Sequence, residues 1–290
     1  MRMSKLRLLG VGAVAALVLS ACGGGTGVDV EVADNPEFAS GTTMAKLADA
    51  GKITIGVKMD QPGIGYKEPG ADAPTGFDIE MGKVIAAKLG VAPEDITWKE
   101  TVSDNREPFL QNGTVDIVLA SYSINDERRQ VVGQYGPYYI TGQQLLVREE
   151  DKDRITGPQQ LADVKTCSVT GSTSLDKVAD DYGASPVPFD TYSDCVNQLL
   201  NGSVDAVTTD GAILLGYAAQ KPDELEVVGK AFSEERYGIG YTHGDTEMCK
   251  FLDETIQGAV EDGTWAEAFE ATLGESGVKT PTPPKPDACE

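Results

Sequence analysis

The sequence has very little histidine. A single histidine, His243, occurs in 290 residues, and it stands beside Gly244 and Asp245 in a loop-like stretch that we expect at the surface. No cluster of histidines and carboxylates with metal-ligand spacing is present. No Gly-rich phosphate loop is present either. We therefore expect no metal site and no cofactor, and we predict that the protein is not an enzyme.

Basic residues are also scarce. Lys and Arg together number 24 against 46 Asp and Glu, which gives a formal net charge of −22. This balance argues against a nucleic-acid partner, because phosphate binding needs a basic surface. An anionic ligand would have to be held by a local cluster of cations that acts against the overall field of the protein.

Long hydrophobic runs are absent after the first 21 residues. Arg2, Lys5 and Arg7 form a basic start, and the apolar run 8–19 that follows is shorter than the roughly 20 residues of a membrane-spanning helix. Such a start describes an export signal. The sequence Leu-Ser-Ala-Cys at its end resembles the bacterial lipobox, which implies cleavage before Cys22, acylation of its sulfur and amine, and anchoring to the outer face of the cytoplasmic membrane. The alternative is an ordinary secretory signal with a chance cysteine.

A short stretch rich in glycine and acidic residues follows Cys22. Gly23 to Gly27 and the segment 29–34 are not expected to pack, and they would let a folded domain stand away from the lipid. Loss of the signal would lower the net charge from −22 to near −25, because it carries three positive charges. We predict a soluble extracytoplasmic domain that touches the membrane through its lipid only and is a monomer.

The other four cysteines have none of the short Cys-x-x-Cys spacing of zinc or redox sites. Outside the cytoplasm, an even number of cysteines favours disulfides, and three pairings are open. We favour Cys167 with Cys195 and Cys249 with Cys289, because each pair then lies within one segment of the chain. Free buried thiols are the alternative.

Strand-like and helix-like segments alternate along the chain, which favours an α/β fold. Residues 53–57 and 115–120 have the composition of strands, and residues 77–89 have helical spacing with Gly90 at the position of a C-cap. An internal echo is more informative: "LQNGTVDIV" at 110–118 returns as "LNGSVDAV" at 200–207. A repeated helix–turn–strand unit suggests two lobes of related design, although Asn-Gly is a common turn.

Two stretches have the character of crossings between these lobes. "YGPYYITGQQLLV" at 135–147 leads out of the first lobe, and residues 232–241 lead back into it, so that two adjacent strands would form a hinge. The Pro-rich end cannot form helix or sheet ladders. The predicted organisation is a signal peptide (1–21), a flexible tether (22–45), a first lobe in two segments (46–140 and 233–275), a second lobe (141–232) and an extended tail (276–290).

Several motifs in this order resemble those of the extracytoplasmic solute-binding proteins of ABC importers, in the polar amino-acid family. They are "GFDIEMGKVIA" from Gly76, "LQNGTVDIVLASYSINDERR" from Leu110, "YGPYY" from Tyr135, "VTGSTS" from Val169 and "VDAVTTDGA" from Val204. The resemblance spans nearly the whole mature chain. It implies the two-lobed periplasmic-binding-protein fold of type II with a two-strand hinge, an amino acid held between the lobes, and delivery to a membrane permease and its ATPase.

The resemblance also implies roles for individual residues. Arg128, at the close of its motif, matches the arginine that holds the α-carboxylate of the ligand through a bidentate guanidinium. Asp210, which ends an apolar strand, matches the carboxylate that holds the α-ammonium. Arg129 is expected to point to another face. Polar groups toward the ligand are expected from Ser121, Ser123, Ser172 and Thr173, with Gly171 supplying backbone; the family often has Gly and Thr at the first two of these positions.

Two further cations are candidates for reading the ligand side chain. Lys58 ends a predicted strand and Arg106 precedes a predicted helix, at places where the acidic amino-acid branch of the family holds a side-chain carboxylate. The alternative is that they are solvated or paired with Asp60 and Glu107. "DQPG" at 60–63 also resembles glutamate receptors of high-GC Gram-positive bacteria. Glutamate is the first choice, followed by aspartate, glutamine and asparagine.

Two other functions compete with this interpretation. The same lobes could serve as a ligand-binding sensor that signals to a membrane partner. Ser174-x-x-Lys177 and Ser103-Asp104-Asn105 are elements of serine enzymes that act on cell-wall peptides. Their order is reversed here and a Lys-Thr-Gly element is lacking, which argues against the enzyme.

Overall fold

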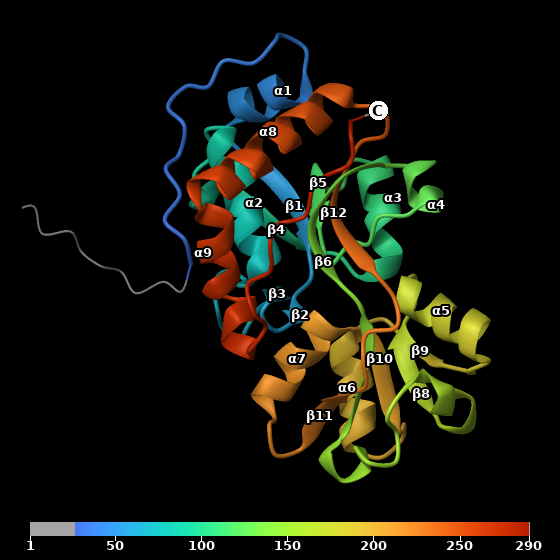
Figure 1. Ribbon diagram of the computed structural model, residues 1–290. Coiled ribbons are helices and arrows are strands. Elements are labelled where there is room, and N and C mark those ends of the chain that lie inside the picture. The colour runs from blue at the N-terminus through green and yellow to red at the C-terminus, as the bar shows by residue number, and fades with distance from the viewer. Residues whose placement is uncertain (1–26, 290) are drawn as a thin grey trace, which may run out of the picture.

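The computed structural model describes residues 27–289, which form two lobes stacked along the long axis of the molecule (Figure 1). Each lobe is built around a five-stranded mixed sheet. The two-lobed α/β fold expected from the sequence is thereby confirmed. The predicted signal peptide (1–21), Cys22 and most of the glycine stretch lie outside the described residues.

The first lobe contains the sheet with strand order β4-β1-β5-β12-β6. β1, β4 and β5 are parallel, and β12 runs antiparallel to its neighbours β5 and β6. Its strands are β1 (Ile53–Val57), β4 (Ile96–Glu100), β5 (Ile117–Leu119), β6 (Gly133–Thr141) and β12 (Glu235–Tyr241). The expected strand 115–120 is shorter in the structure, where β5 covers only 117–119 and the Asp116 side chain accepts the N–H of Thr54 in β1.

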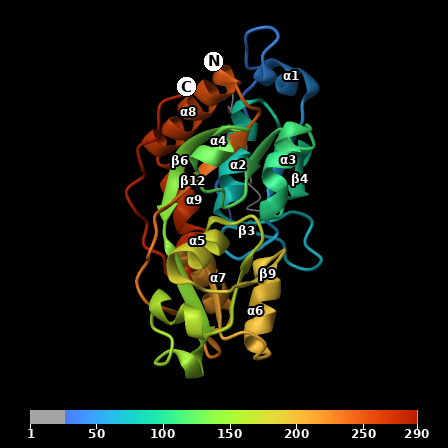
Figure 2. The same cartoon turned by 90° about the vertical axis from the view of Figure 1, so that its right-hand side faces the viewer.

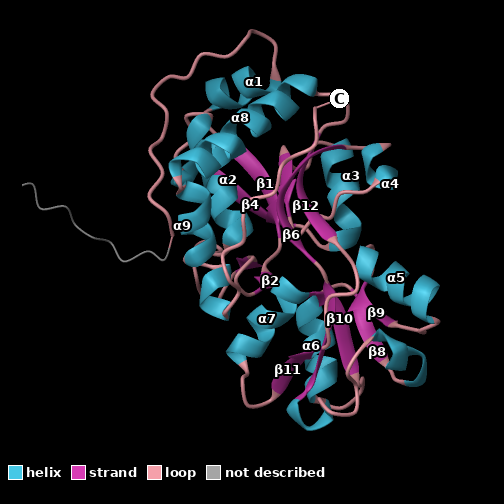
Figure 3. Ribbon diagram, in the orientation of Figure 1, coloured by secondary structure: helices cyan, strands magenta, loops and turns pink. Residues whose placement is uncertain are grey.

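Helices cover both faces of this sheet (Figure 3). The larger apolar core lies under α2, α8 and α9, and a smaller one lies under α3 around Val118 and Tyr122. The helices of this lobe are α1 (Thr43–Ala50), α2 (Phe77–Lys88), α3 (Arg106–Gln111), α4 (Asp126–Arg129), α8 (Thr246–Asp262) and α9 (Thr264–Glu270). Leu89 caps α2 and Gly90 follows at φ +76°, within one residue of the predicted helix end.

The second lobe contains the sheet with strand order β11-β7-β10-β8-β9. Along β7, Leu145 and Val147 pack on one face and Leu146 on the other, as the two-residue period of a strand requires. The strands are β7 (Gln143–Arg148), β8 (Thr166–Val169), β9 (Val187–Phe189), β10 (Ala206–Asp210) and β11 (Leu225–Val228). The helices are α5 (Thr173–Tyr182), α6 (Tyr192–Leu200) and α7 (Gly211–Gln220).

The chain crosses between the lobes twice, on adjacent strands. β6 continues into β7 through Gly142, and the return path runs from β11 to β12. β6 and β12 lie side by side in the first lobe (Figure 2). A short hairpin, β2 (Asp60–Gln61) with β3 (Gly65–Tyr66), extends from the first lobe toward α6 and α7 of the second (Figure 1). The two crossings form the hinge expected of this fold.

The sequence echo corresponds to the same local structure in each lobe. Asn112 and Asn201 end α3 and α6, and each accepts the backbone N–H two residues later, at 2.9 Å. The following Asp116 and Asp205 then accept the N–H of Thr54 (2.7 Å) and Lys165 (3.0 Å) from the neighbouring chain segment. The repeated motif therefore sets how a helix passes into the central strand of each sheet.

The predicted tether of residues 22–45 differs from the structure over its described part. Val28, Val30 and Phe38 pack against the first-lobe core, and the N–H of Val28 donates to the buried carboxylate of Glu80 at 3.1 Å. α1 begins at Thr43, inside the predicted tether. The prediction that residues 29–34 do not pack is therefore wrong, because Val30 packs against the core and the N–H of Ala33 donates to the carbonyl of Ala87 in α2 at 2.9 Å.

Two disulfides join the four cysteines in the pairing that the sequence favours. Cys167–Cys195 ties β8 to α6 within the second lobe, and Cys249–Cys289 ties the C-terminal tail to α8. The tail is further fixed by Asp287, whose carboxylate pairs with Arg129 (2.6 Å) and Arg236 (2.7 Å). Arg129 thus points away from its neighbour Arg128, as expected.

Candidate functional site

A narrow polar cavity lies where the two lobes meet. The walls come from segments that follow the carboxyl ends of β5, β8 and β10, which is where α/β folds place ligands. The lining residues are Ser103, Arg106, Ser121, Ser123, Arg128, Ser172, Thr173, Ser174, Tyr192, Thr209, Asp210 and Ile213.

Seven of the eight predicted ligand residues border this cavity. The eighth, Lys58, lies behind the wall and donates to Ser103 Oγ at 2.9 Å. The structure thus brings the whole predicted set together from both lobes, while the role of each residue toward a ligand remains a prediction.

Three cations gather on the first-lobe side of the cavity. Lys58, Arg106 and Arg128 are all buried. Burial, together with the charges of Arg106 and Arg128, lowers the pKa of Lys58 to about 7, although Asp60 and Asp78 oppose this shift. Burial and the charge of Arg128 also lower the pKa of Arg106 to about 10. A cluster of buried cations that disfavour one another's charge is stabilised by an anion.

Backbone carbonyls hold the two guanidinium groups in place. Arg106 donates to the carbonyl oxygens of Ser103, Ala120 and Ser121, at 3.0 to 3.3 Å. Both Arg106 and Arg128 also donate to the Gly171 carbonyl of the second lobe, each at 3.0 Å. Both groups lie over the ring of Tyr122, at 4.6 and 5.0 Å from its centroid.

Lys58 and Arg106 do not form the ion pairs with Asp60 and Glu107 that the sequence left open. Glu107 pairs with Arg128 Nε at 2.9 Å rather than with Arg106. The carboxylate of Asp60 accepts backbone N–H groups of the second lobe instead of pairing with Lys58.

Asp210 faces the cations from the second lobe. It ends β10 and precedes α7, and its Oδ2 accepts the hydroxyl of Tyr237 at 2.7 Å. Its Oδ1 is buried without a hydrogen-bond partner among residues 27–289. Burial and the nearby charge of Glu235 raise the pKa of Asp210 to about 7. A carboxylate in this state is stabilised by a cation, and an ammonium group would supply both the charge and the missing donor.

Glu235 is a site residue that the sequence analysis missed. It lies on β12, one of the two crossing strands, and is buried. Its Oε2 accepts the hydroxyls of Ser123 from the first lobe (2.7 Å) and Thr173 from the second (3.0 Å). In this structure both hydroxyls donate to this internal carboxylate, and their role toward a ligand stays a prediction. The only sequence signal for Glu235 is its place in the second crossing segment.

Ser172 and Ser121, two other predicted ligand residues, also form hydrogen bonds within the protein. Ser172 Oγ donates to the Val169 carbonyl at 2.6 Å and accepts the Leu175 N–H at 3.1 Å, so it caps α5. Ser121 has a left-handed backbone (φ +43°), and its N–H donates to Asp78 at 2.8 Å. Burial raises the pKa of Asp78 to about 6, although this N–H and the Tyr138 hydroxyl stabilise the charge. Asp78 therefore holds the strained turn that shapes the cavity wall.

The other missed lining residues had weak signals. Ser103 entered the sequence analysis only as an element of a serine-enzyme motif. Ser174 and Thr209 lie within the family motifs "VTGSTS" and "VDAVTTDGA" but were not singled out, and Tyr192 and Ile213 had no signal. The partner lysine of the serine-enzyme motif, Lys177, instead pairs with Asp181 at 2.7 Å. Within residues 27–289 no group of His, Cys, Asp and Glu could hold a metal ion, and no helix is long and apolar enough to span a membrane.

Two α/β lobes on a double-stranded hinge, with a small polar cavity lined from both sides, define a solute-binding protein. The comparisons with known proteins agree with this class. The model of bacterial extracellular solute-binding proteins, family 3, matches residues 53–275, and the chain belongs to this family. The resemblance noted in the sequence is confirmed.

Relatives match over most of their length. The chain is 38% identical to "Glutamate-binding protein GluB" of Corynebacterium efficiens, over 90% of this chain and 88% of that protein. It is 32% identical to "ABC transporter glutamine-binding protein GlnH" of Bacillus subtilis, over 94% and 98%. Among solved structures, the solute receptor for L-cysteine of Neisseria gonorrhoeae has a TM-score of 0.76 and 26% identity, over 82% of this chain and 97% of that one.

Proposed function

We propose that the protein is the lipid-anchored receptor of an ABC importer, and that it captures an acidic or polar amino acid between its lobes. Glutamate is the first choice, then aspartate, glutamine and asparagine. The monomeric receptor then delivers its ligand to a permease driven by an ATPase.

The observation that carries this proposal is the arrangement of charge around one small cavity. Three buried cations lie on the first-lobe side, and Asp210 faces them with an oxygen that has no hydrogen-bond partner among residues 27–289. An amino acid carries a carboxylate and an ammonium, which match Arg128 and Asp210. A second carboxylate on the ligand side chain would place a further negative charge near Arg106 and Lys58 and would compensate the mutual repulsion of the cations.

The relatives support the same class of ligand. One is named for glutamate and another for glutamine, and both names describe α-amino acids with a five-carbon chain. The two ligands differ by one charge at the end of the side chain, so the cations near that end are the residues to test.

The test is calorimetric titration of residues 23–290 with all twenty amino acids, followed by glutamate and glutamine titrations of Lys58→Met. Loss of a hydrogen bond to a charged group should weaken glutamate by roughly 1.5–3 kcal/mol and glutamine by less. The exposed Lys52→Met is the matched control and should leave both affinities unchanged. Arg106→Ala should act in the same direction, but it also leaves backbone carbonyls without their donor.

Equal losses for both ligands would assign Lys58 to folding or closure instead of specificity. A wild type that prefers glutamine would remove the acidic-ligand proposal and keep the amino-acid receptor. A wild type that binds none of the twenty amino acids would overturn the proposed function.

The lipid anchor is a separate part of the proposal. It is supported by the Leu-Ser-Ala-Cys junction after a short apolar run. Cys22→Ser should release a ligand-binding protein into the medium, as measured by cell fractionation. A serine variant that stays with the membrane after cleavage elsewhere would contradict the anchor.

A further inference from the structure

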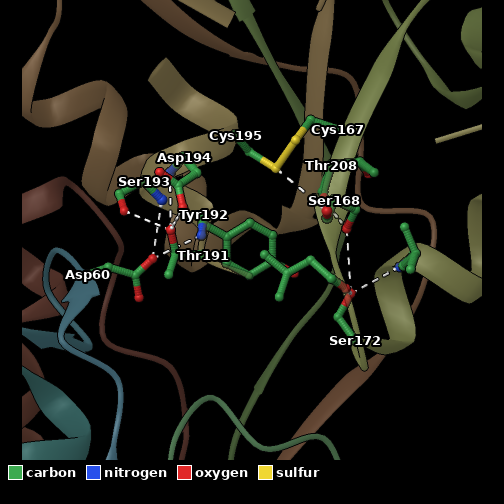
Figure 4. The surroundings of a disulfide bond; sticks show 12 residues. Asp60, Cys167, Ser168, Ser172, Thr191, Tyr192, Ser193, Asp194, Cys195 and Thr208 are labelled. Carbon is green, nitrogen blue, oxygen red and sulfur yellow. Dashed lines mark hydrogen bonds between the residues drawn. A yellow bond between two sulfur atoms is a disulfide. The ribbon is translucent and has the colours of Figure 1, made fainter. Parts of the chain in front are cut away.

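The β2–β3 hairpin of the first lobe makes a specific contact with the second lobe through Asp60. Its Oδ2 accepts the backbone N–H groups of Tyr192 (2.9 Å) and Ser193 (3.2 Å), the first two residues of α6 (Figure 4). The Tyr217 hydroxyl of α7 donates to the backbone carbonyl of Asp60 and lies 3.4 Å from the same carboxylate. One residue of the first lobe thus engages two helices of the second.

The start of α6 is completed by this contact. The first N–H groups of a helix have no partner within the helix. The hydroxyl of Thr191, in the same lobe, accepts the N–H of Asp194 at 3.2 Å. Asp60 accepts the N–H groups of Tyr192 and Ser193 from the other lobe, and its negative charge suits the positive end of the helix dipole.

A glycine in α7 brings the backbones close together beside this contact. A Cβ at Gly216 would lie 2.2 Å from the carbonyl oxygen of Pro62, two residues after Asp60. Glycine therefore permits the hairpin to seat on α7 where any other side chain would hold it away. This close approach is independent of the hydrogen bonds and lies at the same interface.

The contact leads directly to the cavity. Tyr192, whose N–H is held by Asp60, lines the cavity. The same first turn of α6 carries Cys195, which is bonded to Cys167 of β8 (Figure 4). The turn is thus a rigid part of the second lobe, so that its position relative to Asp60 reports how the lobes are arranged.

We propose that Asp60 is a positioning residue of the receptor, which docks on the start of α6 and stabilises the closed arrangement of the lobes around a ligand. The inference rests on the proposed function, in that closure is how the protein would retain an amino acid. Asp60 makes no hydrogen bond to the cation cluster or to Asp210 within residues 27–289, so its removal should weaken every ligand. Its charge also raises the pKa of Lys58, which adds a part that differs between acidic and neutral ligands.

The test compares Asp60→Ala and Asp60→Asn with the wild type by titration and by stopped-flow dissociation. Asp60→Ala should weaken every ligand that binds the wild type, by about tenfold, through faster dissociation. Asp60→Asn keeps an acceptor oxygen but loses the charge, so its affinity should lie between those of Asp60→Ala and the wild type. A loss confined to one ligand, or unchanged dissociation rates, would overturn the proposal.

Asp245→Ala is the matched control. Asp245 caps α8 by accepting the Met248 N–H at 3.0 Å, entirely within the first lobe. Its removal should lower the midpoint of urea unfolding and leave the affinity unchanged. A merely structural Asp60 would behave in the same way as Asp245, with lower stability and wild-type affinity.

Amide exchange separates failure of this inference from failure of the proposed function. If none of the twenty amino acids binds the wild type, the proposed function fails. The contact of Asp60 with α6 is then tested by the rate of hydrogen exchange at the N–H groups of Tyr192 and Ser193. Faster exchange at these two amides in Asp60→Ala supports the contact. Equal exchange in both proteins overturns it.

Discussion

At the scale of single residues, the buried carboxylate of Asp210 lowers the stability of the folded protein near neutral pH, while the proposed binding of an ammonium group needs it. Its pKa is about 7 in the folded protein against an ordinary value of 3.8, chiefly through burial and then through Glu235. The folded state therefore binds more protons than the unfolded state between these two pH values. The contribution of Asp210 to the free energy of unfolding is present at low pH and is lost as pH rises toward 7.

Asp210→Asn should make the unliganded protein more stable at pH 8 while abolishing amino-acid binding. The asparagine keeps an oxygen that can accept the Tyr237 hydroxyl, and it carries no charge beside Glu235. The gain should be on the order of one to a few kcal/mol, because one pKa unit corresponds to ~1.4 kcal/mol. Urea unfolding at pH 8 and pH 5 measures it, and the gain should shrink at pH 5, where Asp210 is protonated. A gain of equal size at both pH values would contradict the pKa argument.

At the scale of helices and strands, the sequence predicts what is local and misses what joins distant segments. The Asn-Gly echo and strand β1 (Ile53–Val57) were predictable, because turn residues and β-branched runs act on their own backbone. Most cavity residues that fall within the family motifs were also predicted, although Ser174 and Thr209 were not. The contact of Asp60 with Tyr192 joins positions 132 residues apart, and no local preference encodes it. Glu235 was missed because its partners come from both lobes.

The two disulfides allow a test at this scale. They close segments of 28 and 40 residues, so each should contribute roughly 3–4 kcal/mol by restricting the unfolded chain. Cys167→Ala with Cys195→Ala should also weaken ligand binding, because the bond fixes the first turn of α6 beside the cavity. Cys249→Ala with Cys289→Ala should cost similar stability and leave binding unchanged, since neither cysteine borders the cavity. Titration and urea unfolding of both double variants check this, and equal effects on binding would contradict the role given to α6.

At the scale of the whole molecule, both sides of the cleft have close backbone contacts between the lobes. The Gly171 carbonyl receives both arginines, and a Cβ at Gly171 would lie 2.9 Å from the backbone of Asp104 in the first lobe. Gly216 meets Pro62 in the same manner at the hairpin. Binding would then depend on how closely the backbones of the lobes can approach, in addition to the side chains that hold the ligand.

Gly216→Ala tests this dependence without touching the cavity. Gly216 lies inside helix α7, where alanine is favoured over glycine by about 1 kcal/mol, so the second lobe itself should become more stable. The added Cβ would meet the Pro62 carbonyl oxygen at 2.2 Å when the lobes close, so affinity for every ligand should fall. Small-angle scattering should show little ligand-induced compaction of this variant.

Gly258→Ala is the matched control for the helix effect. Gly258 lies inside α8, and its added Cβ would have no atom within 4 Å among the described residues. It should raise the free energy of unfolding by a similar amount, about 0.5–1 kcal/mol, with wild-type affinity and wild-type compaction. If Gly216→Ala also kept wild-type affinity, the lobes would bind their ligand in an arrangement more open than the one seen here, and the hairpin contact would be incidental to binding.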